Sequence, residues 1–115
     1  MVITEDRYRT MIRVVLRKYQ KENPGRYGDK ELSKQIKGVK ARFDGIEKKV
    51  SEASTNNGFM SKEILSIVSD LNYLERQQQL IAFHQPYDII TVNSRLQVVL
   101  VKYQTLEVLL EGKNI

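Results

Sequence analysis

The chain contains no cysteine, one histidine and two prolines. Without cysteine it has no disulfide bond, no thiolate metal site and no cysteine nucleophile, and a single histidine excludes zinc sites built from two histidines. His84 precedes Gln85-Pro86 with no obvious partner for Ser-His-Asp catalysis, so we expect a turn residue exposed to water. P-loop, dinucleotide-binding and G-x-S-x-G motifs are also missing. We therefore expect no enzymatic activity, no cofactor and no metal.

Long apolar stretches are missing as well. The longest is Val98–Val101, which is far too short to cross a membrane, and the acidic start, Met1–Asp6, does not resemble a signal peptide. The default expectation is a cytoplasmic protein, with contact to a membrane surface left open. With 115 residues, of which 41% are hydrophobic and 29% charged, the chain is predicted to be one ordered domain, 1–115.

What the sequence does contain is a repeated helical pattern. Breakers at 23–28, 56–58, 84–86 and Gly112 divide it into four segments, at about 4–22, 29–54, 61–83 and 87–111. In each segment, apolar residues recur three and four positions apart, which places them along one side of a helix. These apolar seams are Tyr8, Ile12, Val15, Tyr19; Leu32, Ile36, Val39, Phe43, Ile46, Val50; Met60, Ile64, Ile67, Leu71, Leu74, Ile81; and Ile89, Val92, Leu96, Val99, Tyr103, Leu106, Leu110. The prediction is an all-α, antiparallel four-helix bundle.

Helix ends support this division. Asp29, Ser61 and Asp88 are suitable N-caps, and Gly112 suits a left-handed C-terminal position. Segment 87–111 is rich in β-branched residues, so a hairpin remains an alternative there. Its unbroken heptad pattern favours a helix.

Positive charge is concentrated in the first half of the chain. Residues 1–50 hold 14 lysines and arginines against 7 acids, whereas residues 51–115 hold 5 against 7. On the first two helices, basic residues lie opposite the apolar seams. This predicted basic face consists of Arg7, Arg9, Arg13, Arg17, Lys18, Lys21, Lys30, Lys34, Lys37 and Lys48. If the two helices pack side by side, the face forms one cationic surface for an anionic partner; the alternative is an ordinary solvated surface.

A second apolar stripe runs along the fourth helix. Ile90, Val101 and Val108 lie almost opposite its seam. Two explanations stay open: a homodimer interface, or a helix wedged among the other three.

Polar residues elsewhere give weaker signals. The acids Glu63, Asp70, Glu107 and Glu111 are expected on the solvated surface, and Gln78 is a candidate buried polar residue in the third seam. Leu32–Val39 weakly resembles the turn of a helix-turn-helix motif. The apolar seam continues through this stretch, which favours one helix.

The functional prediction is a non-enzymatic binding or regulatory protein that docks a macromolecular partner, protein rather than nucleic acid, through the predicted basic face. Nucleic-acid binding by the same face is the first alternative. Size, basic charge and the expected bundle also broadly resemble bacteriocin immunity proteins and small regulators of phages and mobile elements, with no motif behind the resemblance. It implies, as a second alternative, an immunity-type protein acting at a membrane receptor.

Overall fold

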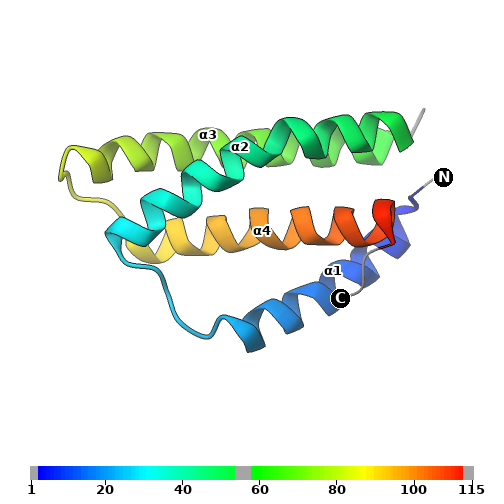
Figure 1. The fold of residues 1–115 in the computed structure, drawn as a ribbon, viewed down its shortest axis with the longest axis horizontal. Coiled ribbons are helices and arrows are strands. Elements are labelled where there is room, and N and C mark those ends of the chain that lie inside the picture. Colours follow the sequence, from blue (N-terminus) through cyan, green and yellow to red (C-terminus); the bar gives the residue numbers. More distant parts are fainter. Residues whose placement is uncertain (1–2, 54–57, 113–115) are drawn as a thin grey trace.

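The computed structural model describes residues 3–53 and 58–112. They form four helices, α1 (Glu5–Glu22), α2 (Asp29–Ala53), α3 (Gly58–Ala82) and α4 (Ile89–Glu111), and no strand within those ranges. Successive helices run in opposite directions (Figure 1). The all-α four-helix bundle is confirmed. The hairpin alternative is wrong, because α4 is one continuous helix. The stretch that resembles a helix-turn-helix motif lies inside the unbroken α2.

The last helix begins and ends as its sequence predicts. The Asp88 carboxylate accepts hydrogen bonds from the Thr91 hydroxyl (2.7 Å) and from the backbone N–H groups of Ile90 and Thr91 (3.1 Å each). These bonds, the Thr91 hydroxyl first, lower the pKa of the Asp88 carboxyl. Gly112 closes the helix at φ 65°, a left-handed conformation that favours glycine.

The two other predicted caps are wrong. α3 begins at Gly58, three residues before Ser61, so Ser61 lies inside the helix. Asp29 is the first residue of α2, and its carboxylate accepts a hydrogen bond from the Tyr87 hydroxyl just before α4. Asp29 therefore lies at a helix start, as predicted, but its side chain joins α2 to the segment before α4 and does not cap α2.

Most members of the predicted seams form the core, but Ile89 at the start of α4 is exposed. Their most deeply buried members include Leu32 and Ile36 of α2, Ile67 and Leu74 of α3, and Val99 of α4. Gln78, the polar member of the third seam, is half-buried and donates to the Ser33 hydroxyl of α2 across 3.5 Å.

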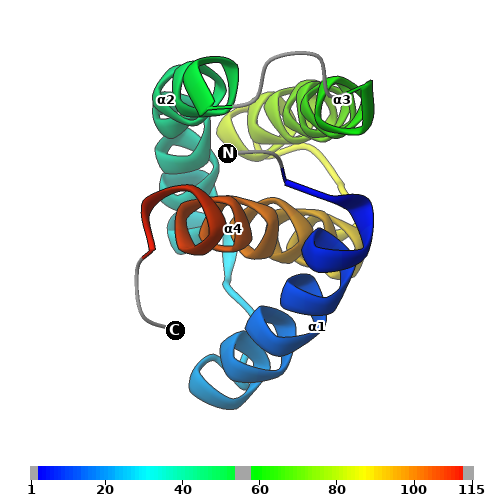
Figure 2. The same ribbon diagram turned by 90° about the vertical axis from the view of Figure 1, so that its right-hand side faces the viewer.

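The arrangement of the helices differs from a square bundle. α4 packs against all three other helices, whereas α1 and α2 do not pack along each other. Viewed along the molecule, α2 and α3 lie on one side of α4 and α1 lies on the other (Figure 2). An amphipathic helix has only one side to bury, but α4 is apolar on two, so it can occupy the middle.

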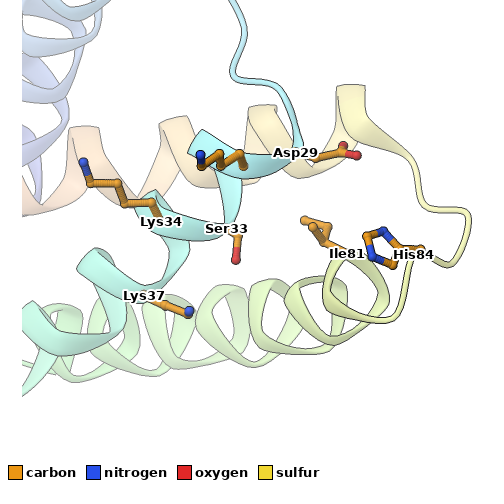
Figure 3. A pocket seen from close by; sticks show the side chains of 7 residues that line it. Asp29, Ser33, Lys34, Lys37, Ile81 and His84 are labelled. Atoms are coloured by element: carbon orange, nitrogen blue, oxygen red, sulfur yellow. The ribbon is translucent and has the colours of Figure 1, made fainter.

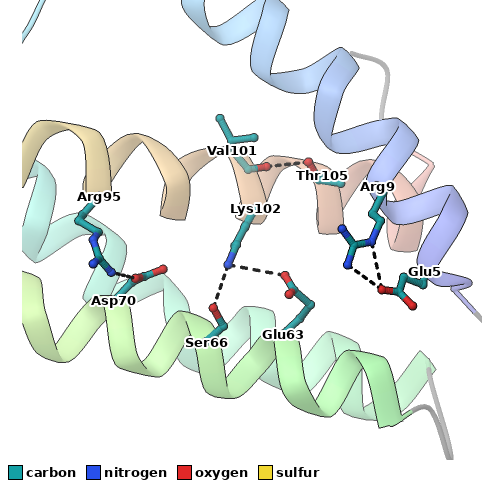
Figure 4. A network of polar contacts seen from close by, with 9 residues as sticks. All are labelled: Glu5, Arg9, Glu63, Ser66, Asp70, Arg95, Val101, Lys102 and Thr105. Carbon is teal, nitrogen blue, oxygen red and sulfur yellow. Dashed lines mark hydrogen bonds and ion pairs between the residues drawn. The ribbon is translucent and has the colours of Figure 1, made fainter. Parts of the chain in front are cut away.

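This arrangement determines which residues of the second apolar stripe are buried. Val101 is only 3% exposed, Val108 is half-buried, and Ile90 at the other end is 57% exposed. Val101 points to the side of α4 on which α1 lies (Figure 4), where the buried Val15 of α1 belongs to the packed face. Val101 is therefore buried within the chain, on the side of α4 toward α1, and is not exposed for a homodimer contact, whereas for the exposed Ile90 such a contact stays a prediction.

The side chain of Asn93 on α4 holds the loop that connects α1 and α2. Its side-chain oxygen accepts from the Tyr27 N–H (2.8 Å), and its side-chain nitrogen donates to the carbonyls of Tyr27 (3.1 Å) and Ile89 (2.9 Å). Neighbouring hydrogen bonds to both backbone groups of one loop residue hold the start of α2 in a defined position.

Candidate binding surface

Basic side chains fall into two classes, the first of which joins helices. Lys40 pairs with Glu75 (2.7 Å), Arg42 with Glu107 (2.7 Å), Lys49 with Glu111, Arg95 with Asp70 (2.8 Å) and Lys102 with Glu63 (3.6 Å). Each pair connects α4 or α2 to a neighbouring helix. None of these five cations belongs to the predicted basic face.

Four of the five acids in these pairs were expected on the solvated surface, namely Glu63, Asp70, Glu107 and Glu111, and for Asp70 that expectation is wrong. Asp70 is 6% exposed and accepts a hydrogen bond from Arg95. Glu63 and Glu107 are half-buried, whereas Glu75 and Glu111 are exposed. Figure 4 shows Asp70 and Glu63 on α3 facing Arg95 and Lys102 on α4. These carboxylates balance cations that the packing of α4 brings against them.

The predicted basic face makes up most of the second class. Nine of its ten side chains are exposed, and Lys18 is half-buried. Three form pairs within their own helix: Arg9 with Glu5 (2.7 Å), Lys18 with Glu22 (3.9 Å) and Lys48 with Glu52 (4.0 Å). The other seven form no ion pair with any described residue; they are Arg7, Arg13, Arg17, Lys21, Lys30, Lys34 and Lys37.

These seven cations belong to two separate groups. One lies on α1 and the other on the first turns of α2, and the two helices diverge from their connecting loop (Figure 1). The condition for one continuous cationic surface, side-by-side packing of the first two helices, is not met. Each group therefore has to be judged by its own surroundings.

The α2 group lines a hollow. This lysine hollow has a volume of about 440 Å³ and is formed by Asp29, Lys30, Ser33, Lys34 and Lys37 of α2 with Ile81 and His84 at the end of α3. Ser33 and Lys37 lie on the side of α2 toward α3, and Ile81 and His84 stand at the end of that helix (Figure 3). Three cations close to the apolar side chain of Ile81 give a hollow that attracts anions and also offers some apolar surface to bury.

Backbone hydrogen bonds fix the position of His84, which lines the lysine hollow. The His84 N–H donates to the Ile81 carbonyl (3.1 Å), and the Gln85 N–H donates to the Leu80 carbonyl (2.8 Å). This is the bonding of a Schellman C-cap, and His84 occupies its left-handed position at φ 55°. Glycine adopts that conformation without strain, so a histidine there costs about 1 kcal/mol. His84 is exposed, as expected.

A second hollow adjoins the first. It also measures about 440 Å³ and shares Asp29, Ile81 and His84 with the lysine hollow; its other lining residues are Gln85, Pro86, Tyr87 and Ile89. We call it the Tyr87 hollow. Burial, together with the hydrogen bond to Asp29, raises the pKa of Tyr87 to about 12, so the phenol stays protonated and continues to donate to that carboxylate.

The α1 group has a different setting. Arg9 and Arg13 border a smaller hollow of about 230 Å³, together with Tyr8, Ile12, Phe59, Glu63 and Lys102. The Tyr8 hydroxyl is buried without a hydrogen bond of good geometry, and burial followed by the charge of Glu63 raises its pKa. Arg9 and Lys102 are already paired with carboxylates, which leaves Arg13 as the one unpaired cation among the described lining residues. This hollow is the weaker anion site.

The lysines of α2 were predicted from the sequence, but the residues that surround them were not. Ile81, His84 and Tyr87 are brought to them from α3 and from the start of α4. The available signal was topological: in an antiparallel bundle, the end of the third helix lies beside the start of the second. Nothing in the local pattern shows that these side chains form hollows.

Other kinds of site find no support within residues 3–53 and 58–112. No group of three or more acidic or histidine side chains there is arranged to hold a metal ion, and none of the four helices is long and apolar enough to span a bilayer. No protein-family model matches the chain, and comparison with curated proteins and with solved structures gives no match either. Its function is therefore inferred from the chemistry of the lysine hollow.

Proposed function

We propose that the chain is a non-enzymatic binding module that docks an acidic protein partner through the lysine hollow. The supporting observation is the set Lys30, Lys34 and Lys37, which is exposed and unpaired among the described residues. Lysines three and four residues apart on one helix repel one another. The three lysines therefore do not stabilise the fold, but an anionic partner would relieve their repulsion and be attracted to them.

A protein partner fits better than nucleic acid. Phosphate backbones are best followed by a continuous cationic track, and the cations of α1 and α2 are on helices that do not pack together. The apolar side chain of Ile81 lines the lysine hollow, and Phe83, two residues later in the sequence, is 74% exposed. Apolar groups among cations suit a partner that carries both acidic and apolar side chains. An immunity-type protein at a membrane receptor would be one case of this docking.

The proposal is tested with two matched charge reversals. One variant carries Lys30→Glu, Lys34→Glu and Lys37→Glu; the other carries Arg13→Glu and Arg17→Glu with Lys21→Glu on α1. Both change the net charge equally at exposed positions. Fluorescence anisotropy then measures binding of a labelled peptide of aspartate and glutamate, and of single-stranded and duplex DNA of similar charge, at several salt concentrations.

We expect the peptide to bind the unmodified chain and to lose at least about 10-fold in affinity for the α2 variant, because three close attractions become repulsions. The α1 variant should lose only about twofold to threefold through weaker long-range attraction. Peptide affinities that are equal for the α2 variant and the unmodified chain would contradict the proposal. Tighter binding to DNA, with a steep salt dependence that the α2 variant removes, would establish the nucleic-acid alternative instead.

A further inference from the structure

The lysine hollow and the Tyr87 hollow adjoin, and we refer to the two together as the groove. They meet at Asp29, Ile81 and His84, which line both. A segment of a partner that fills the first hollow can therefore continue into the second across Ile81 and His84. Both hollows lie at the same end of the bundle, where α2 begins, α3 ends and α4 begins (Figures 1 and 3).

The two halves of the groove differ in charge. The lysine hollow carries Lys30, Lys34 and Lys37. The Tyr87 hollow has no lysine or arginine among its lining residues, and its carboxylate, Asp29, already accepts a hydrogen bond from Tyr87. What it offers instead are the faces of Pro86, Tyr87 and Ile89, the last of which is 37% exposed.

We infer that the docking segment of the partner is an acidic peptide that carries an apolar side chain, preferably aromatic, next to its carboxylates. The carboxylates lie on the lysines of α2, and the apolar side chain is buried against Pro86, Tyr87 and Ile89. This inference deepens the proposed function and rests on it. A second acidic residue in the Tyr87 hollow would lose solvation without finding a cation, whereas an aromatic ring gains by leaving water.

The groove is also largely formed before binding. The backbone hydrogen bonds of His84 and Gln85 to α3 set the position of His84, and the hydrogen bond between Tyr87 and Asp29 joins the segment before α4 to the start of α2. A preformed site loses little conformational entropy when it is occupied. The free energy gained from the apolar contact should therefore increase the measured affinity, because little of it is offset by ordering the loop.

Three labelled peptides test the inference on the full chain. They share one acidic run, and the residue that follows it is phenylalanine, glycine or, as a control for the effect of one additional negative charge, aspartate. We expect the phenylalanine peptide to bind about 10-fold more tightly than the glycine peptide, which corresponds to partial burial of one ring. The aspartate peptide should gain no more than about twofold from its extra charge.

A pair of variants on α4 locates the contact. Ile89→Ser removes an apolar side chain from the Tyr87 hollow, and Val98→Ser removes one of similar exposure, 41%, that lines neither hollow. The preference for phenylalanine should fall at least about threefold for Ile89→Ser and stay unchanged for Val98→Ser. NMR cross-peaks between the phenylalanine ring and Tyr87 provide a readout that does not depend on any substitution.

The outcomes separate the two proposals. Equal affinities for the phenylalanine and glycine peptides, with both still weakened by the lysine reversals, would overturn this inference and leave the proposed function standing. Failure of all three peptides to bind would overturn the proposed function itself. A phenylalanine preference that Val98→Ser reduces as much as Ile89→Ser does would place the ring elsewhere and also overturn the inference.

Discussion

Replacing Val101 by alanine tests whether α1 or a second chain covers the outer stripe of α4. Val101 is 3% exposed, whereas Val98 on the same helix is 41% exposed. Val101→Ala removes two buried carbon groups, each worth about 0.8 kcal/mol, and leaves a cavity, so we expect a loss of about 2.5 kcal/mol. Val98→Ala should cost less than about 1 kcal/mol, because partial exposure and the higher helix propensity of alanine reduce the loss.

Urea unfolding followed by circular dichroism measures both values. In a chain of 115 residues, the Val101 variant should also lower Tm by about 10 °C. Cover by α1 is intramolecular, so the midpoint should not depend on protein concentration. The reasoning is refuted if Val101→Ala costs under about 0.5 kcal/mol, or if the midpoint rises with concentration and the substitution removes that rise.

Four further predictions concern local structure. Gly38→Ala should stabilise the chain by about 1 kcal/mol, since a Cβ at this helical position meets no atom within 4 Å; a loss in urea unfolding would reveal a hidden close approach. Asn93→Ala should cost about 2 kcal/mol and increase hydrogen exchange at Tyr27, because it removes the hydrogen bonds that hold the loop. His84→Gly should stabilise by about 1 kcal/mol through relief of its left-handed backbone; destabilisation would point to a stabilising side-chain contact. The pKa of Asp88 lies below its ordinary value, so its capping contribution is complete at neutral pH and is lost as pH falls through the folded-state pKa. Asp88→Asn should flatten that part of the acid titration of stability, and an unchanged titration would count against it.

Two kinds of basic residue in this chain cannot be distinguished from their spacing. Lys37 and Lys40 are three residues apart on α2, yet Lys40 pairs with Glu75 of α3 at 2.7 Å and Lys37 pairs with no described residue. What separates them is whether a carboxylate of another helix lies within reach. The predicted basic face did exclude the cations that join helices, because it was defined as the side opposite the apolar seam. The face still includes Lys37, which lies on the side of α2 toward α3, so its position relative to the neighbouring helix became known only from the packing.

Periodicity in the amino-acid order specifies the four helices, their approximate ends and the residues that leave water, since burial of one helical face is a local property of the pattern. Leu32, Ile36 and Val99 were assigned to the core correctly on that basis. Which neighbour buries a face depends on how helices cross, and this is settled only when all of them pack together. Packing placed α4 in the middle, gave Val101 a cover from α1, and brought Ile81, His84 and Tyr87 beside the lysines of α2. Contacts between distant segments reflect the shape and volume of many side chains at once, and no single stretch of the chain carries that information.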